Sequence, residues 1–235
     1  MGNIKHVAVV LGISILIVAG LAVYAGQKNA PSAPPPGGED AEALTSPLTP
    51  EEQEIANPEI TNTMNPTAEL NTSMGTIEIE LFEDTMPITV GNFVSLAESG
   101  FYDGIKFHRV IDGFMIQGGD PNTKGDNTAT YGQGGPENNV QDEFVEGPLL
   151  TNVRGTIAMA NTGQPNSGGS QFFINLADNT SLDFDKQPLS SKHPVFGRVV
   201  AGIDVVDTIG KVETDGRDLP TTPVVIESVT IKRGG

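Results

Sequence analysis

The chain contains the stretch Phe107-His108-Arg109-Val110-Ile111-Asp112-Gly113-Phe114-Met115-Ile116-Gln117-Gly118-Gly119-Asp120. It predicts a β-hairpin with strands over 107–110 and 114–117, because an Asp-Gly dipeptide between two apolar runs is a strong hairpin signal. Arg109 and Gln117 stand among the apolar side chains of this hairpin. A guanidinium on an apolar sheet is either paired with a buried acid or offered to an oxygen of a ligand. The hairpin is therefore the first place to look for a functional site.

Short strand-like runs recur on both sides of the hairpin. They cover residues 68–73, 76–81, 156–159, 171–174, 196–200 and 224–231. Two helices are predicted between them. The first begins near Pro87, with Asp84 or Thr85 as its cap, and ends at Gly100; the second covers 203–209. Many short strands with only two helices favour an all-β sandwich or barrel over a parallel α/β sheet.

The first 66 residues differ from the rest. Residues 7–26 carry no charge, and twenty helical residues span about 30 Å, the thickness of a bilayer core. We expect residues 1–26 to be a membrane anchor, or alternatively a cleaved signal peptide, with the following domain outside the cytoplasm. Residues 27–66 hold eight of the seventeen prolines and seven acidic residues, which predicts a disordered linker. A Pro-rich ligand for a partner domain is the less favoured interpretation.

Composition excludes several classes of function. The net charge is −17, so binding of nucleic acid through phosphates is not expected. The absence of cysteine excludes disulfides and thiolate metal sites. The three histidines do not have the spacing of metal ligands, so neither a metal nor a cofactor is expected.

Several long motifs in residues 67–235 closely resemble the cyclophilins, which are peptidyl-prolyl cis-trans isomerases. The opening stretch carries the first of them. The others are Gly155-Thr156-Ile157-Ala158-Met159-Ala160-Asn161, Asn166-Ser167-Gly168-Gly169-Ser170-Gln171-Phe172-Phe173-Ile174 and His193-Pro194-Val195-Phe196-Gly197-Arg198-Val199. The resemblance implies a closed eight-stranded antiparallel β-barrel capped by two helices, with the active site in an outer groove.

The same resemblance implies roles for individual residues. Arg109 would contact the carbonyl of the substrate proline and act on the imide, with Gln117 orienting Arg109 and the peptide. Substrate binding would fall to Phe114, Met115, Ala160, Asn161, Gln171, Phe173, Leu182 and His193. On spacing alone, the alternating Phe114, Met115 and Phe173 would be core residues, Arg109 a structural ion-pair residue and His193 a turn residue.

The chain departs from the family pattern in three places. Thr162 stands where a small residue is usual, Ser181 stands where cyclosporin-sensitive members carry a Trp, and residues 184–191 form an insertion. Loss of the indole predicts weak cyclosporin binding.

The functional prediction is a peptidyl-prolyl isomerase that acts on proline-containing polypeptides and assists the folding of extracytoplasmic proteins. The alternatives are a proline-peptide binding module or holdase with little catalysis, and a structural subunit of a membrane complex.

Overall fold

The computed structural model describes residues 65–187, 189 and 192–234. The predicted anchor or signal peptide and all but the last two residues of the predicted linker lie outside the described residues. Within the part of the chain that is described, no helix has the length and apolar character needed to cross a bilayer.

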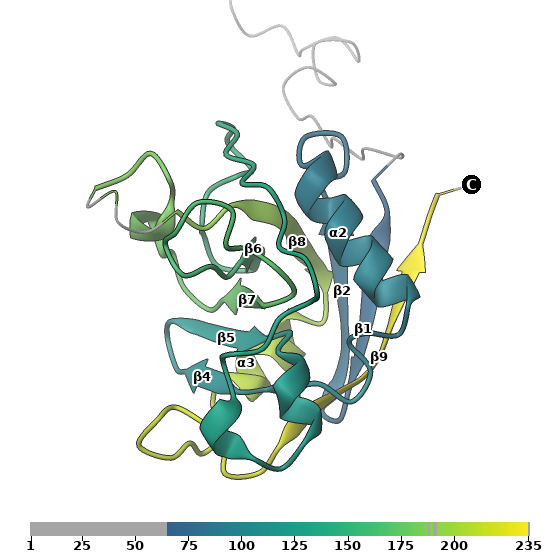
Figure 1. The fold of residues 1–235 in the computed structure, drawn as a ribbon, viewed down its shortest axis with the longest axis vertical. Coiled ribbons are helices and arrows are strands. Elements are labelled where there is room, and N and C mark those ends of the chain that lie inside the picture. The colour runs from purple at the N-terminus through teal and green to yellow at the C-terminus, as the bar shows by residue number, and fades with distance from the viewer. Residues whose placement is uncertain (1–64, 188, 190–191, 235) are drawn as a thin grey trace, which may run out of the picture. The chain divides into compact units, whose positions relative to one another are not determined.

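The described residues form nine strands and two α-helices (Figure 1). The helices are α2 (Pro87–Glu98) and α3 (Ile203–Ile209). The strands are β1 (Thr67–Thr72), β2 (Gly75–Leu81), β3 (Lys106–Phe107), β4 (Arg109–Ile111), β5 (Met115–Gly118), β6 (Thr156–Met159), β7 (Phe172–Asn175), β8 (Val195–Ala201) and β9 (Val224–Lys232). Three short 3₁₀ helices lie in the loops: η1 (Pro121–Lys124), η2 (Thr128–Thr130) and η3 (Thr180–Leu182).

The strands form one antiparallel sheet in the order β3-β9-β1-β2-β8-β6-β7-β5-β4. Its two end strands, β3 and β4, are consecutive in the chain and are separated only by His108. The sheet therefore curls until its ends meet in one run of residues, which makes a nearly closed barrel. The predicted antiparallel barrel with two helices is confirmed. Nine strands are described rather than eight because the expected strand over 107–110 is divided at His108.

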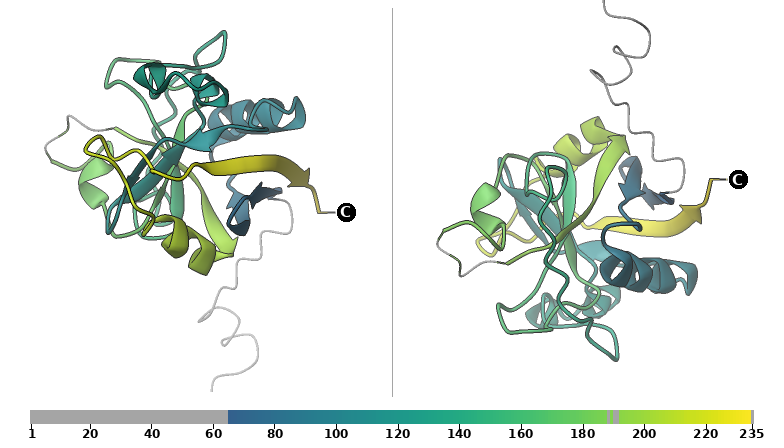
Figure 2. Two further views of the ribbon diagram at one scale, coloured as in Figure 1. Left: turned by 90° about the horizontal axis from the view of Figure 1, so that it is seen from below. Right: turned by 90° about the horizontal axis from the view of Figure 1, so that it is seen from above.

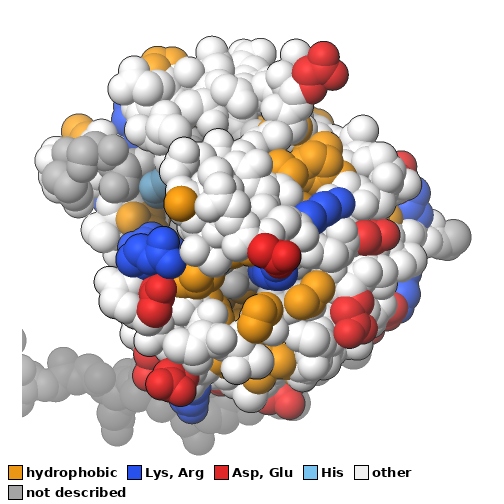
Figure 3. Space-filling view, turned by 60° about the horizontal axis from the view of Figure 1, so that its bottom comes forward, with side chains coloured by type: hydrophobic (Ala, Val, Ile, Leu, Met, Phe, Trp, Pro, Cys, Tyr) orange, Lys and Arg blue, Asp and Glu red, His pale blue; other side chains and the backbone are white. Residues whose placement is uncertain are grey.

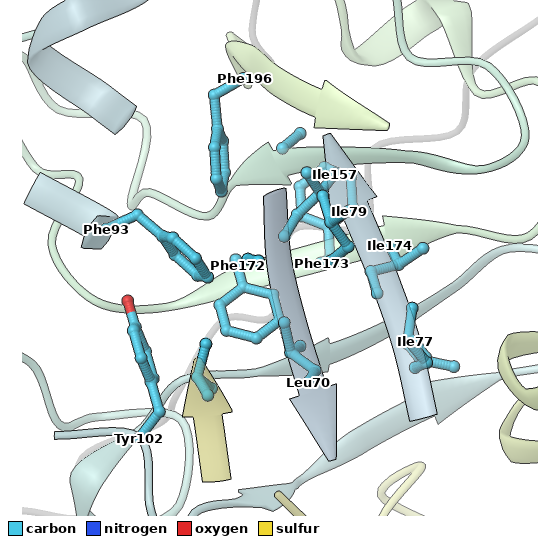
Figure 4. Packing of buried hydrophobic residues seen from close by; sticks show 14 of the residues in the cluster. Leu70, Ile77, Ile79, Phe93, Tyr102, Ile157, Phe172, Phe173, Ile174 and Phe196 are labelled. Atoms are coloured by element: carbon cyan, nitrogen blue, oxygen red, sulfur yellow. The ribbon is translucent and has the colours of Figure 1, made fainter. Parts of the chain in front are cut away.

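The two helices lie on opposite sides of the strands when the barrel is viewed from above and below (Figure 2). α2 packs against β9 and α3 against β2. The apolar face predicted for α2 is buried, and Phe93 at its centre is fully enclosed. The Phe93 ring lies 5.1 Å from that of Tyr102, 5.8 Å from Phe172 and 5.5 Å from Phe196 (Figure 4). These aromatic contacts join α2 to β7, which also carries Phe173, and to β8.

The cap predicted for α2 is wrong. The N-cap position is Met86, and no side chain at that position caps the helix. Instead, the carboxylate of Glu143, from the long loop before β6, accepts hydrogen bonds from the backbone N–H groups of Ile88 (3.1 Å) and Thr89 (2.8 Å). An anion at a helix N-terminus satisfies unpaired donors and complements the helix dipole. The two residues are 54 positions apart in the sequence, so no local motif predicts this contact.

Candidate active site

The predicted hairpin is present and places Arg109 opposite Gln117. β4 and β5 pair with Arg109 facing Gln117 and Ile111 facing Met115. The turn between them contains Gly113 at φ 69°, in the left-handed region that glycine adopts without steric cost. β5 then pairs with β7, which brings Phe173 beside Gln117. Three adjacent strands thus hold four of the predicted site residues.

A cavity of about 230 Å³ opens on this part of the barrel. Its walls come from β4, β5, β7, η3 and the segments that follow β6 and precede β8. The lining residues are Arg109, Phe114, Met115, Gln117, Ala160, Asn161, Phe173, Leu182 and His193. The structure thus brings nine of the ten predicted site residues together around one cavity. One face of the molecule shows hydrophobic side chains in recesses beside adjoining basic and acidic side chains (Figure 3).

The apolar floor of the cavity belongs to both the core and the site. Met115 and Phe173 are only 2% and 4% exposed and pack in the main hydrophobic cluster. Phe114 and Leu182 are partly exposed at the same cavity. Met115 and Phe173 therefore belong to the core and also line the cavity, because a residue of a barrel wall can complete the interior and still present an edge to a shallow pocket.

Arg109 lies at the cavity with its side chain 43% exposed. Its Nε lies 3.6 Å from Oδ2 of Asp218, a residue in the turn between α3 and β9. Gln117, which was expected to orient Arg109, donates its side-chain amide to Oε1 of Gln171 at 3.1 Å. The acid beside the guanidinium was not predicted from the sequence.

Gln171 is the predicted residue that does not line this cavity. It lies in a neighbouring cavity of about 600 Å³, where its Nε2 donates to the carbonyls of Gly132 (3.1 Å) and Gly134 (2.7 Å). Gln117, Ala160 and Asn161 line both cavities. Gln171 therefore links the hairpin to the long loop that bounds the second cavity.

The departures from the family pattern lie at the margins of the site. Thr162 lines the second cavity rather than the first. Ser181 is exposed in η3, next to Leu182. In the insertion, the Phe184 ring stacks on Phe144 with the ring centres 5.4 Å apart. The insertion thus contacts the loop that supplies Glu143.

His193 forms a wall of the cavity and is held in one orientation. Its Nδ1 lies 3.0 Å from the carbonyl oxygen of Met159, and its ring meets that of Phe173 edge to face at 5.4 Å. Because a carbonyl can only accept, Nδ1 carries the proton in the neutral ring and Nε2 is left as an acceptor. Burial lowers the pKa of His193, and the hydrogen bond to Met159 opposes this shift only in part.

Asn161 forms hydrogen bonds that connect two segments at the edge of the cavity. Its Nδ2 donates to the carbonyl of Lys192 at 2.7 Å, and its Oδ1 accepts from the backbone N–H of Gly163 at 3.0 Å. The first bond ties the segment after β6 to the segment before β8. The side chain expected to hold a substrate thus also fixes the distance between two walls.

A buried carboxylate supports the wall formed by Leu182 and His193. Asp183 is 4% exposed and accepts from the hydroxyl of Thr151 (2.5 Å), and from the backbone N–H (2.7 Å) and Nδ2 (2.8 Å) of Asn152. Asn152 also donates to the carbonyl of His193 at 3.0 Å. Sequence reasoning missed both Asp183 and Asn152, since they are 31 residues apart and match no motif.

Buried His108 and half-buried His193 predict a loss of stability in mild acid. Burial lowers the pKa of His108 and His193 below the usual 6.5. The unfolded chain therefore binds more protons, so their contribution to stability is complete above about pH 6.5 and is lost as the pH falls through that value. The carboxylates with lowered pKa values (Glu69, Asp185 and Asp215) change their contribution to stability only at more acidic pH than the histidines do. We expect a smaller free energy of unfolding in urea at about pH 5.5 than at about pH 7.5.

The His193→Gln variant provides the control for this effect, because glutamine can still donate to Met159 but does not titrate. The difference in unfolding free energy between the two pH values should shrink in the variant. An unchanged difference would show that His193 does not contribute.

Comparison with known proteins shows which family the barrel resembles. The family model described as "Cyclophilin type peptidyl-prolyl cis-trans isomerase/CLD" matches residues 67–231. The chain is 46% identical over 188 residues to "Peptidyl-prolyl cis-trans isomerase A" of Mycobacterium tuberculosis, covering 70% of this chain and 91% of that protein. It is 42% identical over 165 residues to "Peptidyl-prolyl cis-trans isomerase ppi1" of Schizosaccharomyces pombe, covering 69% of this chain and 97% of that protein.

A solved structure agrees with the sequence comparisons. A cyclophilin type peptidyl-prolyl cis-trans isomerase of Cryptosporidium parvum, crystallised in the presence of the dipeptide Ala-Pro, superposes with a TM-score of 0.59 at 29% identity, covering 70% of this chain and 98% of that one. The Schizosaccharomyces pombe relative is matched over nearly its whole length by about two thirds of this chain. Since the described barrel also has its own hydrophobic core, we expect residues 65–235 to fold alone. With its antiparallel barrel, its hairpin and its family match over 67–231, this chain belongs to the cyclophilin family of peptidyl-prolyl cis-trans isomerases.

Proposed function

We propose that the cavity lined by Arg109, Phe114, Met115 and Phe173 is the active site, and that the enzyme assists the folding of proteins outside the cytoplasm. The observation that carries the first part is the cavity itself, which joins a half-exposed guanidinium to an apolar floor. A proline ring needs an apolar surface, while its carbonyl and imide nitrogen need a hydrogen-bond donor. Both are present within one cavity.

The reaction demands little chemistry of the protein. Rotation about an X-Pro amide faces a barrier of about 18–20 kcal/mol because resonance gives the C–N bond double-bond character. The two isomers differ by only about 0.5–1 kcal/mol, so the site must accept both and favour the twisted state between them. We assign stabilisation of the twisted state to Arg109. Its charged donors can hydrogen-bond the lone pair that localises on the imide nitrogen as resonance is lost.

The other cavity residues hold the substrate in this proposal. Phe114, Met115, Phe173 and Leu182 enclose the proline ring, and Ala160 and Asn161 border the peptide backbone. His193 contributes a neutral ring to the wall. Gln117 and Gln171 act through their mutual hydrogen bond, which fixes the edge of the site next to the second cavity.

The extracytoplasmic role rests on the amino-terminal sequence alone. Residues 7–26 are uncharged and long enough to span a bilayer as a helix. The full-length chain should remain in the membrane pellet after alkaline carbonate extraction. When protease is added to intact cells or spheroplasts, it should digest the barrel. Replacing Ile15 and Ile17 by Arg should release the protein into the soluble fraction. Protection of the barrel from protease would contradict the proposed orientation, and a shortened soluble chain would indicate cleavage.

Weak cyclosporin binding is expected of this site. Ser181 is small and exposed beside Leu182, and the chain has no tryptophan to offer an indole donor and a large apolar face. A Ser181→Trp variant should bind cyclosporin about two- to tenfold more tightly than the parent, as an aromatic contact of this kind contributes about 0.5–1.5 kcal/mol. Equal affinities in a fluorescence or calorimetric titration would contradict this account.

A further inference from the structure

We propose that Asp218 positions Arg109 and offsets its charge, so that the enzyme does not favour substrates with an acidic residue directly after proline. The inference rests on the proposed function of Arg109 and concerns the charge of the polypeptide that this site accepts. Asp218 lies 109 residues from Arg109 in sequence, and its role follows from contacts that only the folded barrel creates.

Two contacts fix Asp218 beside β4, the strand that carries Arg109. Its carboxylate Oδ2 lies 3.6 Å from the Nε of Arg109. Its carbonyl accepts a hydrogen bond of 2.8 Å from the backbone N–H of Val110, the residue that follows Arg109. Because backbone and side chain both reach the same strand, movement of Asp218 relative to Arg109 is restricted.

The turn that carries Asp218 is itself strongly organised. The carboxylate of Asp215 accepts from the backbone N–H groups of Arg217 (2.8 Å) and Leu219 (3.1 Å), and the N–H of Asp218 donates to the Asp215 carbonyl (3.1 Å). Asp218 adopts φ 62°, a left-handed conformation that aspartate tolerates better than most residues. A side chain in this conformation persists where its surroundings hold it, as the bonds within this turn do.

Arg109 needs such a partner because Gln117, directly across the hairpin, is bonded to Gln171. The Arg109 and Asp218 side chains are 43% and 45% exposed. Water and salt therefore screen the pair, and it adds little to the stability of the fold. Its effect is expected on the orientation of the guanidinium and on charges that a substrate brings close to it.

The charge preference follows from the chemistry of the substrate. If Arg109 binds the carbonyl of proline, the next residue begins at the atom bonded to that carbonyl carbon. This residue must lie beside Arg109 and hence beside Asp218. Two unit charges about 4 Å apart interact by about 1 kcal/mol in water, which corresponds to roughly a fivefold change in an equilibrium constant. A glutamate after proline is attracted by Arg109 and repelled by Asp218, so the pair should leave little net preference between glutamate and lysine. Without the Asp218 charge, the attraction of Arg109 for glutamate should remain.

The test compares residues 65–235 of the parent with the Asp218→Asn variant on three peptides: Ala-Ala-Pro-Glu, Ala-Ala-Pro-Gln and Ala-Ala-Pro-Lys, each with blocked ends. The parent should show no preference between lysine and glutamate in kcat/KM, with a ratio close to one. Asp218→Asn should favour glutamate over lysine by about three- to tenfold at low salt, mostly in KM, because Arg109 is no longer offset. The variant should also show a kcat on the glutamine peptide lowered about two- to fivefold, since Arg109 loses a restraint. About 0.5 M salt should reduce the variant's preference.

The matched control is Glu98→Gln. Glu98 forms an equally long ion pair, 3.6 Å from Arg233, with similar exposure, on a helix that contributes no residue to the cavity. This variant removes the same unit of charge and should keep the parent's ratio close to one. If it too comes to favour glutamate, net charge rather than Asp218 is responsible and the inference fails.

The remaining outcomes separate this inference from the proposed active site. Loss of activity in Arg109→Ala together with an unchanged charge preference in Asp218→Asn would overturn the inference alone. Full activity in Arg109→Ala would overturn the assignment of Arg109 and the inference with it. Asp218→Asn should unfold at the same urea concentration as the parent, because asparagine also tolerates the left-handed conformation. A folded variant with an unchanged preference is therefore decisive against the role of Asp218.

Discussion

Replacing Arg109 by alanine is expected to lower kcat/KM for isomerisation of an X-Pro peptide by about a hundred- to a thousandfold, the cost of losing one preorganised donor at a transition state. Arg109 lies at the cavity with its guanidinium partly exposed and held by Asp218, so no conformational change is needed to present it. The loss should fall on kcat more than on KM, because the apolar floor that holds the proline ring is unchanged.

An Arg109→Lys variant is the informative companion. Lysine keeps the charge but not the planar fork, so it should recover only part of the activity. Both variants should unfold at nearly the same urea concentration as the parent, because a half-exposed ion pair contributes little stability. Arg109→Ala activity within a few-fold of the parent would remove Arg109 from the mechanism.

Among the variants considered, Phe93→Ala should lower the free energy of unfolding most. The expected loss is about 3–5 kcal/mol, the usual cost of removing a buried phenylalanine side chain. The Phe93 ring is fully buried and contacts three other aromatic rings, which come from three different parts of the barrel. The cavity left behind could be filled only if α2 moved towards the sheet, which would disturb the other contacts of the helix. Because small domains have about 5–15 kcal/mol of stability in total, the midpoint of urea unfolding should fall sharply.

Phe184→Ala is the control for this prediction. Phe184 also stacks on another ring, that of Phe144, but it is only partly buried and lies outside the main cluster. Its loss should cost about 0.5–1.5 kcal/mol, the value of an aromatic pair. If Phe93→Ala is no more destabilising than Phe184→Ala, the aromatic cluster does not hold the barrel together as described.

Local signals predicted most of the fold. The Asp112-Gly113 turn, the apolar face of α2 and the Gly-bounded strands each follow from residues close together in the chain, and the structure has them within a few residues of the expected positions. The closure of the sheet did not follow from spacing. It depends on how β9 and β5 each pair with one half of the run from Lys106 to Ile111, and only the family resemblance supplied it.

The site was predictable where its residues lie in motifs and not where they depend on distant contacts. Nine of the ten predicted residues surround one cavity because β4, β5, β6 and β7 pair side by side. Glu143 at the helix terminus, Asp183 under the pocket wall and Asp218 beside Arg109 were missed. Each is an ordinary acidic residue in a loop, and its partner lies 31 to 109 residues away. Nothing in local sequence distinguishes such a carboxylate from one on a solvated surface.

The most direct test of the central claim is exchange spectroscopy by NMR on a blocked Ala-Pro peptide with isotope-labelled residues 65–235. We predict exchange peaks between the cis and trans isomers at catalytic enzyme concentration, together with shift changes centred on the amides of Met115, Ala160, Asn161 and Phe173. Shift changes at these residues without faster exchange would make the domain a proline-peptide binder rather than an enzyme. Exchange with shift changes confined to another face would place the active site elsewhere and contradict the account.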